Sequence, residues 1–139
     1  SGLATLGDDG HGAVYFIGYG IGSPAAADQP GWTTEKGVCV PESAPGIYKM
    51  TAQAGLEGST TLGQRFRVSG WSGKFFKNRG WDGLGTFSLA PGTEAFLSIA
   101  GDGNIEIASG VTLDEGATYC LTLDVTAGND KPVLSMVKK

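Results

Sequence analysis

The feature that most constrains this chain is a series of short segments in which apolar and polar residues alternate. Gly46–Ala52 and Gln64–Val68 alternate residue by residue, and such segments end close to Gly, Pro, Asn or Asp. Alternation with a period of two places every second side chain on one face of a strand, which suits a sheet with one buried face. The pattern therefore predicts many short strands that bury a common core.

Ten segments carry the strand pattern, and their spacing is typical of a β-sandwich or a barrel. They are Val14–Ile17, Gly37–Val40, Gly46–Ala52, Gln64–Val68, Lys74–Lys77, Thr86–Leu89, Ala95–Ile99, Ile105–Ile107, Tyr119–Val125 and Val133–Val137. Helical periodicity is nearly absent, because Leu3–Leu6 is too short and Ser23–Asp28 contains Pro24 instead of an amphipathic stripe. The 24 glycines follow no fixed period, which suits turns between strands. The sequence therefore predicts an all-β protein.

Length and organisation indicate one domain. The 139 residues are 40% hydrophobic, enough to bury a two-layer core, and no linker or internal repeat divides them. The polar, glycine-rich beginning predicts a flexible N-terminal segment at 1–12, followed by a single β-sandwich domain at 13–139.

The charge balance argues against one class of partner. The chain carries 10 Lys and Arg residues against 14 Asp and Glu residues, and no more than two basic residues are adjacent. A surface that follows nucleic-acid phosphates needs clustered Lys and Arg, so we expect no nucleic-acid partner. No apolar run approaches the roughly 20 residues that span a bilayer, so we expect no membrane insertion by these residues.

Metal and cysteine chemistry find little support in the sequence. Cys39 and Cys120 lie in neither a CxxC motif nor a Cys/His metal spacing, and we expect no metal or cofactor. A disulfide between them needs Cα atoms within about 7 Å, which a sequence does not determine, and two separate thiols are the alternative. Gly101–Asn104 offers oxygen atoms at alternate positions, as a calcium loop does, but lacks the later bidentate Glu, so a hairpin turn is favoured.

Several segments, in a fixed order, resemble one protein family. The segments are Val14-Tyr15-Phe16-Ile17-Gly18, Gly31-Trp32, Pro45–Lys49, a strand with Phe66, Asn104–Ile107, Gly116–Asp124 and Val133–Lys138. This order is similar to that of the repeated binding domains of the SusE and SusF outer-membrane lipoproteins, which belong to starch-utilisation-type systems of gut bacteria. Two features depart from the family: Phe66-Arg67-Val68 replaces its usual Phe-Lys-Phe, and Trp71–Trp81 is richer in aromatic and basic residues.

The resemblance implies an immunoglobulin-like, two-sheet antiparallel β-sandwich of about 8–10 short strands. It implies an extracytoplasmic location on the surface of the outer membrane, with the full-length protein anchored by an upstream lipidated cysteine. It also implies a non-catalytic role, in which the domain holds a polysaccharide near a transporter together with other outer-membrane components of glycan uptake.

The segment Ser69–Gly83 contains the most informative side chains. It holds two tryptophans, two phenylalanines, two lysines, an arginine, an asparagine and an aspartate. Sugars need this mixture, because their C–H faces stack on indole rings and their hydroxyl groups hydrogen-bond to charged and amide side chains. Trp71 and Trp81 follow glycines, and Trp32 follows Pro30-Gly31, so turns are expected to project these rings. We predict Trp81, Trp71 and Trp32 as stacking platforms, with Lys77 and Arg79 as hydroxyl contacts.

The alternative is that these tryptophans fill the core and that Lys77 and Arg79 are solvated strand ends. The domain would then be a structural spacer or a protein-docking sandwich of the same lipoprotein, without a glycan site. An enzyme is not expected. No nucleophile elbow is present, the one histidine is His11, and nothing indicates a catalytic pairing of the carboxylates Glu35, Glu57, Asp82 and Glu94.

Overall fold

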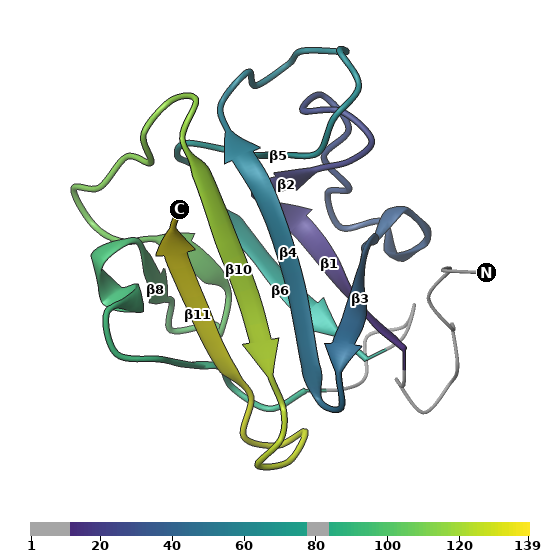
Figure 1. Cartoon of the computed structure of the whole chain (residues 1–139), viewed down its shortest axis with the longest axis vertical. Coiled ribbons are helices and arrows are strands. Elements are labelled where there is room, and N and C mark those ends of the chain that lie inside the picture. Colours follow the sequence, from purple (N-terminus) through teal and green to yellow (C-terminus); the bar gives the residue numbers. More distant parts are fainter. Residues whose placement is uncertain (1–11, 78–83) are drawn as a thin grey trace.

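A computed structural model describes residues 12–77 and 84–139, and this part of the chain is all-β (Figure 1). Its strands are β1 (Ala13–Tyr19), β2 (Ile21–Gly22), β3 (Val38–Ala44), β4 (Ile47–Ala54), β5 (Arg65–Phe66), β6 (Ser72–Phe76), β7 (Ser88–Leu89), β8 (Leu97–Ile99), β9 (Ile105–Ile107), β10 (Thr118–Asp124) and β11 (Val133–Lys138). Two 3-10 turns, η1 (Thr34–Lys36) and η2 (Thr93–Ala95), complete the elements. None of the helices in these two stretches is long and apolar enough to cross a membrane.

All ten predicted strands are confirmed, although several boundaries differ. β1 continues through Gly18, where the sequence predicts that the strand ends. The strand continues because a glycine, which has no side chain, lets β1 and β6 approach each other closely. A Cβ atom there would lie 2.3 Å from the carbonyl oxygen of Ser72 on β6. β3 likewise continues through Pro41, which is paired with Ala13 at the start of β1. The predicted segment 1–12 lies almost entirely outside the described residues.

The strands form one path, in the order β7-β11-β10-β4-β3-β1-β6-β9-β8. β3 carries this path from one layer to the other, since Val38–Pro41 pair with β1 and Glu42–Ala44 pair with β4. Figure 1 shows β4, β10 and β11 in front of β1 and β6. β5 pairs with both β2 and β4, so the mixed sheet is nearly closed into a barrel.

The prediction of a purely antiparallel arrangement is wrong. β4 pairs with β5 in parallel, and so does β7 with β11. β5 and β7 have only two residues each and are reached through loops, so no tight hairpin fixes their direction.

The core lies between the two layers and is rich in aromatic rings. Alternate residues of β4, β10 and β11 point into it, which is the alternation visible in the sequence. β1 differs, because its residues are buried on both sides from Ala13 to Gly18. Phe16 packs edge-on against Phe75, with ring centroids 5.3 Å apart, and Phe75 packs edge-on against Phe87 at 6.3 Å. Complete burial of such a side chain contributes about 1.5–3 kcal/mol to stability.

The two cysteines point outward from different layers. Cys39 lies between the buried Val38 and Val40 on β3, and Cys120 lies between the buried Tyr119 and Leu121 on β10. Neither forms a disulfide. Of the two alternatives that the sequence leaves open, the structure contains separate thiols.

Candidate functional site

The predicted platform Trp71 lies in the core. Its side chain is only 3% exposed, and its indole Nε1 donates a hydrogen bond of 2.7 Å to the carbonyl oxygen of Arg67. The ring packs against Phe16 and Phe66, with centroids 6.0 and 5.7 Å away. Gly20 makes room for it, because a Cβ atom at that position would lie 2.6 Å from the indole. The predicted exposure of Trp71 is therefore wrong.

Trp32, by contrast, is 42% exposed. The preceding residue, Gly31, forms an isolated antiparallel bridge with Gly18 of β1, through hydrogen bonds of 2.6 and 3.0 Å. The bridge thus holds the loop that carries Trp32 against the edge of β1.

A second exposed aromatic ring, Tyr19, lies close to Gly31. Val14 and Phe16 of β1 point into the core, so Tyr15, Ile17 and Tyr19 point to the other side of this layer. Tyr15 and Ile17 are buried there too, and only Tyr19 is exposed. Tyr19 is 40% exposed, and its hydroxyl oxygen lies only 3.3 Å from the position that a Cβ atom on Gly31 would take. Tyr19 and Trp32 are therefore both exposed next to Gly31.

Polar side chains continue this face across β6 and β9. Ser72 is paired with Tyr19, and its hydroxyl accepts a hydrogen bond of 3.2 Å from Asn104 Nδ2. Lys74, two residues further along β6, donates through Nζ to the carbonyl oxygen of Asp102 at 2.9 Å. Glu106 follows the buried Ile105 and so points outward on β9. We call the set Tyr19, Trp32, Ser72, Lys74, Asn104 and Glu106 the outer face.

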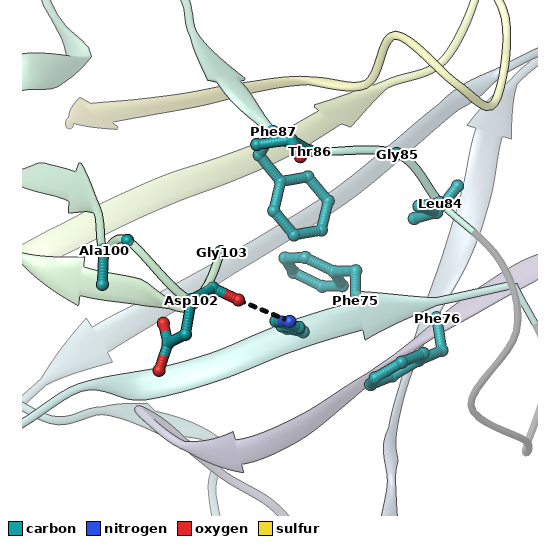
Figure 2. Close-up of a pocket in the computed structure, with 11 residues that line it drawn as sticks. Phe75, Phe76, Leu84, Gly85, Thr86, Phe87, Ala100, Asp102 and Gly103 are labelled. Atoms are coloured by element: carbon teal, nitrogen blue, oxygen red, sulfur yellow. Dashed lines mark hydrogen bonds between the residues drawn. The ribbon is translucent and has the colours of Figure 1, made fainter.

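A cleft adjoins the outer face where β9 stops pairing with β6. It has a volume of about 290 Å³. Its walls are Lys74, Phe75, Phe76, Leu84, Gly85, Thr86, Phe87, Ala100, Gly101, Asp102 and Gly103. Figure 2 shows the rings of Phe75 and Phe87 next to each other in this cleft, while Phe76 lies on the other side of β6. We call it the β6 cleft, and Lys74 belongs to both the cleft and the outer face.

The turn that forms one wall of the β6 cleft is the predicted hairpin turn. It joins β8 to β9, and the amide of Gly103 donates to the carbonyl oxygen of Ala100 at 2.8 Å. The Asp102 carboxylate accepts hydrogen bonds from Asn104, through the backbone amide at 2.9 Å and Nδ2 at 3.3 Å. Within residues 12–77 and 84–139, no group of three or more His, Cys, Asp or Glu side chains is placed to hold a metal ion.

A further hollow, of about 390 Å³, lies along the loop that precedes Trp32. Its polar side chains mainly hold the loop itself. Asp28 accepts a hydrogen bond from the amide of Ala25, and Gln29 accepts one from the amide of Gly20 and donates one to the carbonyl oxygen of Ala26.

The opposite layer offers a different surface. The side chains on the outside of β4, β10 and β11 are Lys49, Thr51, Gln53, Thr118, Cys120, Thr122, Asp124, Val133, Ser135 and Val137. No aromatic ring is among them, so the two layers are chemically distinct on their outer sides.

Of the remaining predicted site residues, Lys77 is half-buried directly after β6. Arg79 and Trp81 lie outside the described residues. The structure therefore leaves Trp32 exposed and places Trp71 in the core, and the outer face adds Tyr19, Ser72, Lys74, Asn104 and Glu106. The alternation Tyr15, Ile17, Tyr19 on β1 could have identified Tyr19, had Gly18 not suggested the end of the strand.

The family model described as "Domain of unknown function (DUF5121)" matches residues 9–126, which is most of the chain. The chain belongs to the DUF5121 family. No curated protein and no solved structure matches it. The match to the DUF5121 family includes β1, β6 and β9, which carry the outer face of the domain.

The outer face of this DUF5121 domain combines two kinds of interaction. The rings of Tyr19 and Trp32 provide apolar surface with few rotatable bonds, so contact with them orders little additional structure. Lys74 and Asn104 supply hydrogen-bond donors, and Ser72 and Glu106 supply acceptors. This arrangement suits a ligand with flat apolar faces bordered by hydroxyl groups.

Proposed function

We propose that the domain is a non-catalytic carbohydrate-binding module, which holds a neutral polysaccharide, such as a starch-like glucan, on the outer face. The observation that supports this most strongly is the exposure of Trp32 and Tyr19 next to Gly31, with Tyr19 beside the polar side chains of β6 and β9. Positive and negative side chains both occur there, which favours neutral sugars over strongly charged ones.

The expected affinity of one domain is low. Stacking of a ring on an aromatic side chain contributes about 1–3 kcal/mol, by analogy with nucleic-acid bases. Two such rings offset little more than the entropic cost of association. A protein with several such domains would gain affinity for a long polymer through multivalency.

The resemblance to SusE and SusF supports a setting for this function. In our proposal the domain has an immunoglobulin-like sandwich arrangement and belongs to a lipid-anchored protein on the surface of the outer membrane. It then works beside the other components that take up the glycan. Lys77, Arg79 and Trp81, which follow β6 directly in sequence, are further candidates for contacts to the ligand.

A spacer or protein-docking domain is the second candidate. The burial of Trp71 favours it, because a predicted platform serves the core instead. In this alternative, Trp32 and Tyr19 contact no sugar.

Affinity electrophoresis separates the two candidates. Native gels would contain starch, pullulan, dextran, xylan, mannan or no glycan, and would carry the wild type beside a Tyr19→Ala/Trp32→Ala variant. A Lys49→Ala/Thr51→Ala variant on the opposite layer is the matched control. We expect one glycan to retard the wild type and the control but not the Tyr19/Trp32 variant, with all three folded by circular dichroism. If none of the glycans retards the wild type, the spacer or docking function is favoured.

A further inference from the structure

The β6 cleft lies at one edge of the outer face. Asn104 donates to Ser72 and to the Asp102 carboxylate, and Lys74 donates to the backbone oxygen of Asp102. These hydrogen bonds connect the position beside Tyr19 with the wall of the cleft. A chain lying on Tyr19 and Ser72 that continues across β6 therefore reaches the cleft.

The cleft has the size and lining of a site for one sugar ring. Its volume of about 290 Å³ lies at the lower end of small-molecule sites, which leaves room for a single ring and little more. Phe75 and Phe87 line the cleft with core rings that are only 3% and 6% exposed (Figure 2), and Lys74 and Thr86 provide polar groups. The Asp102 carboxylate points away from the two rings and towards its partner Asn104.

The walls on either side of the cleft differ in how tightly they pack. Gly85 is fixed against the loop before β11, since its amide donates to the carbonyl oxygen of Asn129 at 2.9 Å. A Cβ atom at Gly85 would lie 2.3 Å from the carbonyl oxygen of Asp130, so this wall has no room for a side chain. At Gly101, on the opposite wall, a Cβ atom would meet nothing within 4 Å. The hairpin-turn wall therefore has space for an added side chain at Gly101.

From these features we infer that the β6 cleft binds one terminal sugar residue, the end or a single-residue branch of the glycan that lies on the outer face. This inference rests on the proposed function and adds to it the form of the ligand. Lys74 contacts both parts of the ligand. The domain then prefers glycans with many ends or branches to a continuous chain that only passes over Tyr19 and Trp32.

The test fills the cleft without changing the outer face. Gly101→Phe adds a ring where the wall is open, and Ser109→Phe adds the same ring to an exposed turn outside the cleft as a control. Thr86→Val removes one hydroxyl and preserves shape. The probe is a hexasaccharide of whichever glycan retards the wild type in the gels, and binding is followed by NMR through the amide signals of the protein.

We expect the amides of Thr86, Gly101 and Gly103 to shift together with those of Tyr19 and Ser72 when the hexasaccharide binds the wild type. Gly101→Phe should weaken binding at least about tenfold, Thr86→Val less, and Ser109→Phe not at all. If Gly101→Phe binds as tightly as the wild type and only outer-face signals shift, the terminal-residue inference is wrong and the proposed function stands. If no glycan retards the wild type, both are wrong.

Discussion

Trp71 and Trp32 both follow a glycine, yet their rings have opposite surroundings. At Trp71 the decisive residue is the distant Gly20, whose missing side chain leaves the space that the indole fills. At Trp32 the decisive feature is the bridge between Gly31 and Gly18, which holds the loop at the edge of β1. A glycine beside a tryptophan in sequence therefore does not determine whether the ring is exposed.

The burial of Trp71 leads to a stability prediction. Trp71→Ala should lower the free energy of unfolding by about 3–5 kcal/mol, because it leaves a cavity between Phe16 and Phe66 and removes the hydrogen bond to Arg67. Urea denaturation followed by circular dichroism measures this. Trp32→Ala should cost much less, since its ring is partly in solvent. Equal stability of Trp71→Ala and the wild type would contradict the core position.

At the scale of elements, the pairing of β1 with β6 organises both the core and the outer face. Gly18 and Gly73 lie opposite each other in this pairing. A Cβ atom on Gly73 would lie 2.3 Å from the Phe16 ring, and one on Gly18 would lie 2.3 Å from the backbone of Ser72. The absence of both side chains lets the strands and the core aromatics approach closely, and Tyr19 and Ser72 follow as the next pair on the outer face.

We therefore expect Gly18→Ala to lower the free energy of unfolding by roughly 2–4 kcal/mol, since it adds both a steric clash and an unfavourable φ of +109°. Gly58→Ala is the matched control, because its φ is +79° but no atom lies within 4 Å of the added Cβ. The control should cost only about 1 kcal/mol, through backbone strain alone. Thermal or urea unfolding measures both, and equal losses would show that the close approach is unimportant.

The end of β11 carries an exposed ion pair, between Lys138 Nζ and Asp114 Oδ2 at 2.6 Å. The hydrogen bond from Lys138 to Asp114, and then the charge of Asp114, raise the pKa of Lys138 above its usual 10.5. A lysine with a raised pKa in the folded state contributes stability at all pH values below its unfolded pKa. That contribution is lost as the pH rises through the folded pKa.

Asp114→Asn should therefore return the pKa of Lys138 towards 10.5, measured by NMR titration of its side chain. Any stability difference between this variant and the wild type should be present at neutral pH and disappear at pH values above the folded pKa. An unchanged Lys138 pKa in Asp114→Asn would show that the pair is not formed in solution.

At the scale of the whole molecule, the alternation of side chains was sufficient to predict the all-β fold and its ten main strands. Two-residue strands such as β2 are too short to produce a pattern, and the parallel pairing of β5 and β7 depends on loop paths that alternation does not describe. For the proposed site, composition predicted tryptophan platforms, and of these Trp32 is exposed. The sequence did not predict Tyr19 as a site residue, because Gly18 was expected to end the strand. A sequence does not distinguish a glycine that ends a strand from one that allows two strands to approach closely.

We propose that the outer face of the β1, β6 and β9 layer binds a glycan through Trp32 and Tyr19. The most direct test is an NMR titration with an oligosaccharide of the glycan that retards the domain, following the indole N–H signals assigned with Trp32→Phe and Trp71→Phe variants. We predict that the Trp32 indole signal and the amides of Ser72, Asn104 and Glu106 shift, whereas the Trp71 indole and the amides of Thr51, Thr122 and Ser135 do not. A shift confined to the opposite layer, or an unchanged Trp32 signal at saturation, would contradict the claim.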